Sequence, residues 1–296
     1  MQLTAATLGI GAALVANASW VIGSIVFARL LRDGSPVGLN LGRGLFTVFY
    51  LGVVLWLSAG WTSLSADNLL RLVGSGLLGM ALGDSLFFAA LARLGPRLTL
   101  LLGMMGPVFS VLLGLLVLGE RFDPLDAVGM VLTLTGVAGV LWRRYEPERT
   151  DERWLGVGLA LGATLAMAVA SLLAKVALVE VPPLQAAFVR MAASVAALSL
   201  VGLATGKLRA WLTPLYTGSG RWQLHFAIVV VVFGGFFLSM VALRLLPLSM
   251  AALVAASEPL MALLITWLAL GQRVSRGEAA SVLVGLVGVF LLVFQG

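Results

Sequence analysis

Two acidic residues stand inside apolar runs of the sequence, where a charge is unfavourable. Asp84 lies near the middle of one run and Glu258 near the middle of another. An ionisable side chain at the centre of a membrane helix costs about 2.5–3.5 kcal/mol on insertion scales, so each one needs a reason to be there. Because burial disfavours the charged form, such a carboxylate is suited to take up and release a proton or to bind a solute. The alternative is that both acids are held in structural ion pairs.

Two arginines also lie inside apolar runs, each at the same distance from a proline. Arg43 follows Pro36, and Arg190 follows Pro183, by seven residues, which is about 10 Å along a helix. Two interpretations are open. The guanidinium groups set helix packing by pairing with carbonyls or acids, or one of them binds a substrate carboxylate, for which its planar fork is well suited.

Four uncharged side chains complete the candidate substrate- and proton-binding residues. Asn17, Ser171 and Ser257 are polar residues within apolar runs and are expected to turn away from lipid. Trp20 also lies in the middle of a run, whereas most other tryptophans lie near the ends of runs, as interfacial anchors do. Trp20 therefore either stacks on a solute or faces lipid.

A proline interrupts two of the apolar runs at corresponding places, after Gly106 in one and after Glu258 in the other. Proline removes an intrahelical hydrogen bond, and Gly/Pro breaks at corresponding places in two membrane helices point to a site at the membrane midplane. We therefore predict that Gly106, Pro107 and Pro259 are kink or gating positions. Kinks that serve packing alone are the alternative.

The elements that must position these residues are membrane helices. Of the 296 residues, 60% are hydrophobic and only 11% are charged, with a mean hydropathy of +1.07, whereas about 25% is typical of soluble domains. Strand-like alternation is absent, which favours an all-α integral membrane bundle over a barrel. Breaks in the pattern give ten segments of span length, at 5–28, 37–58, 69–92, 98–118, 124–142, 154–178, 184–205, 222–244, 249–270 and 276–294.

The second half of the sequence repeats the first. Each half holds five spans, an odd number, so the second copy must cross the membrane in the opposite sense, as an inverted repeat. We predict the repeats at 1–146 and 147–296. Asp84 aligns with Gly235 and Glu258 with Gly106, so each half contributes one acid and one glycine. Other aligned pairs, at offsets of 147 to 152 residues, are Ser24/Ser171, Arg43/Arg190, Gly83/Gly234, Pro107/Pro259 and Gly136/Gly288.

Loop charges predict the orientation. Apart from the two arginines within spans, 13 Lys and Arg residues lie in loops after odd-numbered spans and 4 in loops after even-numbered spans. By the positive-inside rule, the face with 13 charges is cytoplasmic, and both termini are outside.

Two stretches carry a resemblance to a known family. They run from Gly106-Pro107 through Leu118-Gly119-Glu120-Arg121 to Gly136-Val137, and from Glu258-Pro259 through Leu270-Gly271-Gln272-Arg273 to Gly288-Val289. Together with Arg43 and Arg190, they resemble the signature of the drug/metabolite transporter superfamily, in its EamA-like ten-span branch, over essentially the whole chain. The resemblance implies transport of amino acids, other metabolites or drugs. It also implies cytoplasmic termini, opposite to the loop charges. The second copy departs from the signature at Gln272, where the first has Glu120.

Several classes of function are excluded. The chain has no cysteine and one histidine, His225, so thiolate and His-rich metal sites are ruled out. It has no G-x-x-x-x-G-K-[ST] motif for using ATP. The net charge of +6 comes from loop residues between apolar runs and indicates no nucleic-acid partner. We expect no cofactor.

The sequence therefore predicts a secondary active transporter for a small amino-acid-like or drug-like metabolite. Alternating access, proton coupling and export are expected, in a bacterial inner membrane, with a small-molecule substrate, protons and membrane lipid as partners. The chain is expected to be a monomer or homodimer. The alternatives are an integral-membrane lipid-modifying enzyme, which needs a cluster of His, Asp or Glu at one interface, and a structural membrane protein, which leaves the acids inside the spans unexplained.

Overall fold

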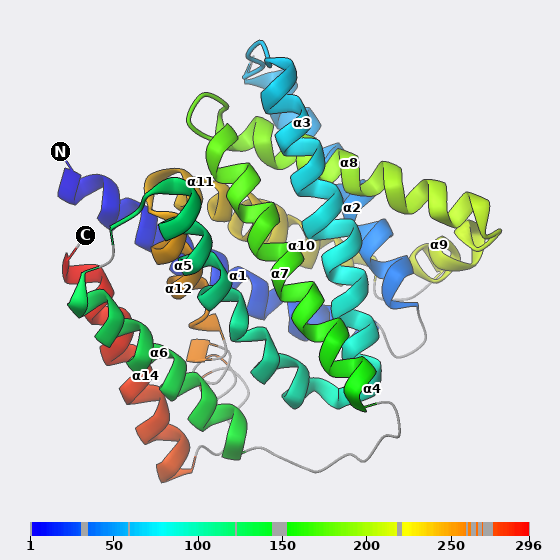
Figure 1. Ribbon diagram of the computed structural model, residues 1–296. Helices are drawn as coiled ribbons and strands as arrows, with labels where there is room; N and C mark the ends of the chain where they lie inside the picture. The colour runs from blue at the N-terminus through cyan, green and yellow to red at the C-terminus, as the bar shows by residue number, and fades with distance from the viewer. Residues whose placement is uncertain are drawn as a thin grey trace.

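The computed structural model describes residues 2–30, 35–58, 60–121, 123–143, 153–217, 221–258, 260–261, 265, 268 and 275–295. These residues form helices and no strand (Figure 1). The helices of the first half are α1 (Gln2–Leu30), α2 (Pro36–Leu57), α3 (Ala66–Ser75), the π-helical segment η2 (Gly76–Gly83), α4 (Asp84–Gly103), α5 (Met105–Leu118) and α6 (Pro124–Arg143). Those of the second half are α7 (Arg153–Ala177), α8 (Pro183–Ala204), α9 (Leu208–Thr217), α10 (Arg221–Val229), the π-helical segment η3 (Val230–Phe237), α11 (Leu238–Leu245), α12 (Leu248–Ala255) and α14 (Arg276–Gln295).

Many of these helices are membrane spans by length and composition. About 20 apolar residues cross the hydrocarbon core of a bilayer. Within the described residues, six stretches are long and apolar enough, and two shorter apolar helices, Met105–Leu118 and Pro124–Gly139, accompany them. The six are Ala5–Gly23, Val37–Leu57, Ala66–Leu91, Trp154–Ala177, Pro183–Ala204 and His225–Leu245. Large apolar side chains also cover the outer surface, among them Leu116, Trp154 and Phe226, as a lipid-facing surface requires. The prediction of an all-helical integral membrane protein is confirmed.

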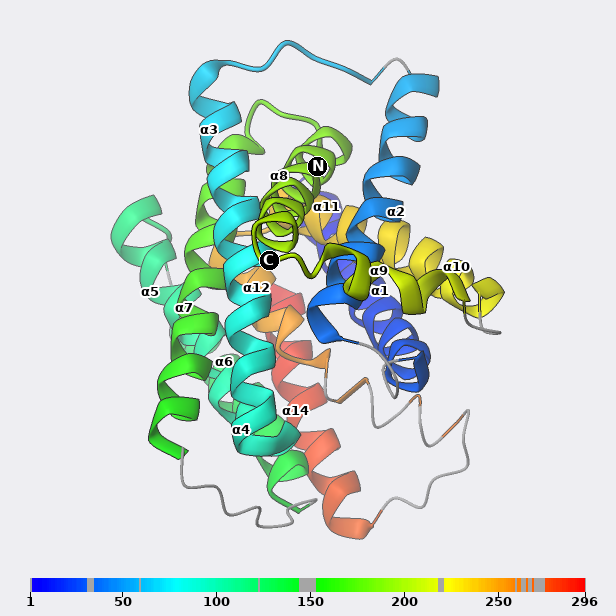
Figure 2. The same ribbon diagram turned by 90° about the vertical axis from the view of Figure 1, so that its right-hand side faces the viewer.

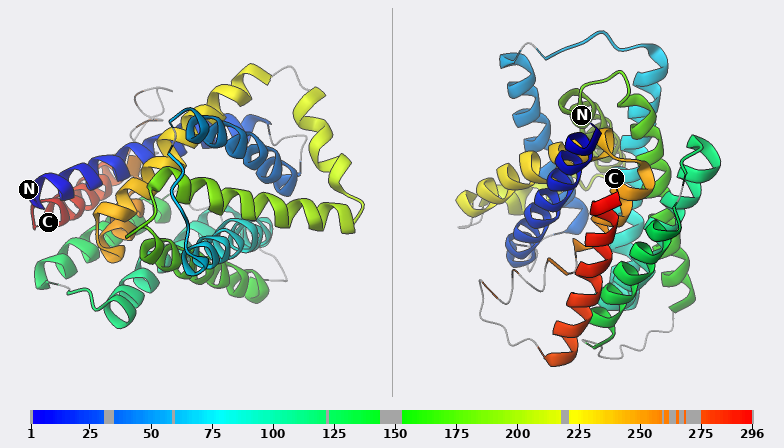
Figure 3. Two further views of the ribbon diagram at one scale, coloured as in Figure 1. Left: turned by 90° about the horizontal axis from the view of Figure 1, so that it is seen from above. Right: turned by 90° about the vertical axis from the view of Figure 1, so that its left-hand side faces the viewer.

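The packing partners of each half correspond to those of the other. The first span of one half packs along the third span of the other: α1 contacts η3 and α11, and α7 contacts α3, η2 and α4. The second spans, α2 and α8, pack together, and so do the last spans, α6 and α14, which lie side by side in Figure 1. The start of α1 and the end of α14 also lie near one another (Figure 3). For these helices, the packing partners in one half thus correspond to those in the other, with the two halves exchanging roles.

One predicted break does not form. The sequence predicts that span 69–92 ends at the break 93–97, but α4 continues through it to Gly103, and the helix first breaks at Met104. Figure 2 shows α3 and α4 as one long cyan helix beside α7. In the second half the equivalent break does form, because Leu246 is extended (φ −105°, ψ 153°) before Pro247 and α12 starts at Leu248.

Capping side chains explain why only the second break forms. Lys175 Nζ donates hydrogen bonds to the carbonyls of Leu243, Arg244 and Leu246 at the end of α11. The Glu120 carboxylate accepts from the backbone N–H groups of Leu248 and Ser249, and from the Ser249 hydroxyl, at the start of α12. These contacts satisfy backbone groups that a helix end leaves without partners. For the break at 93–97, the corresponding caps would come from Ala28 and Gln272, which align with Lys175 and Glu120, so neither charged cap is available.

The turn after α5 aims Glu120 at α12. Gly119 ends the helix with φ 64°, in the left-handed region that favours glycine, and the Glu120 N–H donates to the carbonyl of Gly114. The Leu-Gly-Glu motif of the sequence is therefore a helix cap that joins the end of α5 to the start of α12.

Candidate functional site

A cavity of about 650 Å³ lies in the middle of the bundle, and both halves of the chain line it. Its walls come from α1, α2, η2 and α4 of the first half and from α7, α8, η3, α11 and α12 of the second. The structure brings seven of the eight predicted binding residues to this cavity, namely Asn17, Trp20, Arg43, Asp84, Ser171, Arg190 and Glu258. The eighth, Ser257, is buried and accepts a hydrogen bond from Asn17, which lines the cavity.

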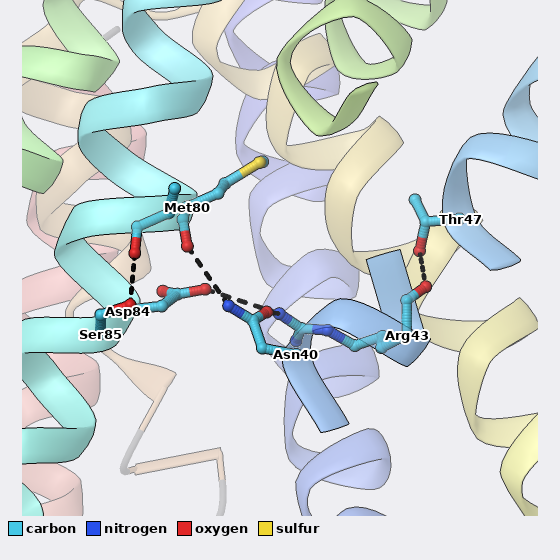
Figure 4. Close-up of polar contacts among 7 residues, drawn as sticks. Asn40, Arg43, Thr47, Met80, Asp84 and Ser85 are labelled. Atoms are coloured by element: carbon cyan, nitrogen blue, oxygen red, sulfur yellow. Dashed lines mark hydrogen bonds and ion pairs between the residues drawn. The ribbon is translucent and has the colours of Figure 1, made fainter. Parts of the chain in front are cut away.

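An ion pair occupies one wall of the cavity (Figure 4). Asp84 is the first residue of α4, directly after the π-helical segment η2, and its Oδ2 lies 3.6 Å from Nη2 of Arg43 on α2. The same Nη2 donates to Asn40 Oδ1 at 2.7 Å, and Asn40 Nδ2 donates to the carbonyl of Met80 at 3.3 Å. The arginine is therefore anchored to both the second and the third spans. π-Helical segments occur often at functional sites.

Asn40 is a cavity residue that the sequence prediction missed. It lies three residues before Arg43 on α2, so the two side chains share one face of the helix. This spacing could have identified Asn40 from the sequence, because a polar side chain one turn before a buried arginine is placed to orient the guanidinium group.

Two aromatic rings cover the other side of the Arg43 guanidinium. Trp20 on α1 and Phe236 on η3 meet edge to face, with ring centroids 4.7 Å apart and an interplanar angle of 74°. The Cζ of Arg43 lies 5.3 Å from the Trp20 centroid and 5.2 Å from the Phe236 centroid, within the range of a cation–π interaction. Trp20 thus lines the cavity and contacts a charged group. Phe236 was not predicted, because an apolar residue in an apolar span carries no distinguishing signal.

Asn17 ties α1 to the end of α12. Its Nδ2 donates to the carbonyl of Val254 at 2.9 Å and to Ser257 Oγ at 3.2 Å, and the Ser257 hydroxyl donates to the same carbonyl at 2.7 Å. These bonds satisfy backbone where α12 ends, and Glu258 follows with its side chain on the cavity. Among the described residues, Glu258 has no hydrogen-bond or ion-pair partner. Pro259 lies outside the described residues.

Arg190 enters the cavity from α8 and is only 6% exposed. Its Nη1 lies 2.9 Å from the sulfur of Met240, a weak acceptor. Its Nε is buried and has no hydrogen-bond partner within the described part of the chain. Asp84 interacts with it electrostatically, although the ion pair found among the described residues joins Asp84 to Arg43.

The other predicted kink positions lie away from the cavity wall. Gly106 and Pro107 are in the first turn of α5, directly after the break at Met104. A proline in the first turn of a helix loses no hydrogen bond, since the N–H groups there have no partner within the helix. Pro107 therefore starts a helix rather than bending one.

Comparison with known proteins places this bundle in a family. The profile of the EamA-like transporter family matches residues 7–142 and again residues 154–294. The chain is thus a membrane protein of two related helical repeats. It belongs to the EamA-like transporter family, within the drug/metabolite transporter superfamily, and the resemblance found in the sequence is confirmed.

A solved crystal structure of another protein has the same fold. It superposes with a TM-score of 0.74 at 18% sequence identity, covering 100% of this chain and 99% of that one. A comparison with curated proteins gives no match.

Proposed function

We propose that this protein is a secondary active transporter that carries a small metabolite through its central cavity by alternating access. The observation that carries the proposal is the composition of the cavity wall: Arg43, Asp84, Arg190 and Glu258, all within apolar segments, converge on one space lined by both halves of the chain. Charges at this depth are typical of substrate and ion pathways. Membership of a transporter family favours this function over a lipid-modifying enzyme or a purely structural protein.

The fold that we propose for this function has ten membrane helices in two inverted repeats, 1–146 and 147–296. The packing of the helices supports this fold. In one direction α1 packs against η3 and α11, and in the other α7 packs against the equivalent elements η2 and α4. A cavity between such repeats opens to one side and then the other when one half rocks against the other.

We assign the coupling proton to Glu258, with Asp84 as the second acid of the site. Asp84 is held in an ion pair by Arg43. Glu258 lines the same cavity with no charged partner among the described residues, so nothing there fixes its protonation state. A group that gains and loses a proton during a transport cycle needs this freedom.

The proposal extends to setting and direction. We expect a bacterial inner membrane, where a proton gradient is available, and export as the direction of net flux. The partners would be the solute, protons and lipid, and the protein would act as a monomer or homodimer without a cofactor.

The test is flux in proteoliposomes. Vesicles that contain a pH-sensitive dye and the purified protein are exposed to a solute panel, with and without a pH gradient. The native protein should couple solute movement to proton movement, whereas Glu258→Gln should remain folded and lose the dependence on the gradient while solute exchange continues. A folded Glu258→Gln protein with unchanged proton-coupled flux would remove Glu258 from the mechanism.

A further inference from the structure

We propose that the cavity binds an organic monoanion, a solute with one carboxylate and an apolar body, and that Arg190 binds the carboxylate. This inference rests on the proposed transport function of the same cavity. It names the chemical class of the solute and the residue that selects it.

Within the part of the chain that the structure describes, the guanidinium of Arg190 has one hydrogen-bond acceptor, the weak sulfur of Met240. An arginine has five N–H donors in a rigid plane. In Arg190 the thioether of Met240 accepts from Nη1, and Nε has no hydrogen-bond partner among the described residues. The side chain is 6% exposed and reaches the cavity. A buried cation that borders an internal space and has only a weak acceptor among the described residues is suited to a carboxylate, which accepts two parallel hydrogen bonds from one guanidinium.

Arg43 is the less suitable of the two arginines. Its Nη2 already contacts the Asp84 carboxylate and the Asn40 side-chain oxygen. The rings of Trp20 and Phe236 also cover its guanidinium. A solute carboxylate would have to displace these partners at Arg43, whereas at Arg190 it displaces only a weak sulfur acceptor.

Charge balance also favours an anion. The cavity wall carries two arginines, while Asp84 lies in an ion pair with one of them. With Glu258 protonated, as proposed for the coupling proton, one positive charge is unbalanced. A solute carboxylate in the low-dielectric interior neutralises it.

An ammonium group finds fewer partners in this cavity. The faces of Trp20 and Phe236, which would attract a cation, are already in contact with Arg43. Asp84 is paired, and Glu258 is the one acid of the cavity wall without a partner among the described residues. Comparing a zwitterion with a monoanion therefore tests the proposal, since the ammonium group of the zwitterion would have to bind Glu258.

The remaining wall fits an apolar body. It is built largely from aliphatic, aromatic and thioether side chains, among them Leu39, Phe87, Met167, Leu243 and Ala251. Cavities of roughly 300–1,000 Å³ bind solutes up to the size of a drug, and this one has about 650 Å³. The space is larger than a carboxylate alone requires.

Binding to the purified full-length protein in detergent tests the proposal with four solutes that share one body. The probes are 3-phenylpropionate, 3-phenylpropionamide, 3-phenylpropylamine and phenylalanine, and binding is measured by the concentration dependence of Tm. We expect the acid to bind about 10- to 100-fold more tightly than the amide, since hydrogen bonds to a charged group are the stronger ones. The amine should bind no better than the amide, and phenylalanine no better than the acid.

Variants assign the preference to one residue. Arg190→Gln should bind the acid and the amide alike, and Arg190→Lys, which keeps the charge, should keep part of the preference. Arg71→Gln is the matched control: Arg71 lies on α3, outside the cavity, and donates to Asn68.

The possible results separate this inference from transport itself. Equal binding of acid and amide to the native protein, absence of any Tm increase with the acid, or tighter binding of phenylalanine would each overturn the monoanion assignment. So would a folded Arg190→Gln protein that keeps the acid preference. If the amine is bound and carried in vesicles, transport holds and the anion assignment is wrong. If the acid binds through Arg190 and nothing crosses the vesicle membrane, the anion site holds and the transport function is wrong.

Discussion

Asp84→Asn removes one charge of the cavity ion pair and tests whether that pair stabilises the bundle. The pair joins α2 to the start of α4 at 3.6 Å, with side chains that are 12% exposed for Arg43 and 22% exposed for Asp84. Removing one partner of a fully buried pair costs about 3–5 kcal/mol, because the other charge is left uncompensated. Exposed pairs contribute less than about 1 kcal/mol. This pair is long and borders a cavity, so we expect a loss of about 2 kcal/mol.

The assay is thermal unfolding in detergent of four proteins: native, Asp84→Asn, Arg43→Gln and the double variant. A loss of about 2 kcal/mol corresponds to a decrease in Tm of roughly 5 °C for a chain of this size. The double variant should be more stable than the sum of the single losses predicts, because it leaves no unpaired charge.

Flux measured on the same proteins separates structure from mechanism. Asp84→Asn should also impair transport, in solute affinity or in coupling, if both acids belong to the site. An Asp84→Asn protein with native Tm, together with additive effects in the double variant, would refute the assignment of a stabilising ion pair. Asp84 would then be present for transport alone.

Two further predictions follow from the caps and the loop charges. Glu120→Ala should lower stability by about 1–2 kcal/mol, measured by thermal unfolding, because the N–H groups of Leu248 and Ser249 lose a charged acceptor; an unchanged Tm would mean that the cap contributes nothing. Gly296→Cys introduces the sole cysteine of the chain and, by the positive-inside rule, should react with a membrane-impermeant thiol reagent added outside intact cells. Protection from that reagent would favour the cytoplasmic termini that the family resemblance implies.

The cavity residues were predictable because lipid leaves charged side chains few alternatives. Arg43, Asp84, Arg190 and Glu258 are far apart in the chain, yet a charge inside an apolar span must face the interior of the bundle. The four therefore had to share a limited space. The repeat offset also showed that Arg43 and Arg190 occupy equivalent positions in the two halves. The family comparison confirms that the two halves are related.

Other features depended on contacts that a single segment does not show. The break at 93–97 has the residues of a turn, but whether a helix breaks there depends on caps from distant elements. In the second half, Lys175 and Glu120 supply these caps. Phe236 and Met240 line the cavity, but in sequence they are ordinary apolar residues of a span.

The two acids show how a duplicated fold acquires an asymmetric site. Asp84 aligns with Gly235, and a Cβ at Gly235 would lie 3.2 Å from ring atoms of Trp20. Any side chain there would need the Trp20 ring, which packs against Phe236 and Arg43, to shift by a few tenths of an ångström. A second aspartate would compete with the tryptophan for this space, and at this position only the first half has an aspartate. Among the described residues, Arg190 therefore lacks the close ion pair that Arg43 makes with Asp84, and the proposed carboxylate site rests on this asymmetry.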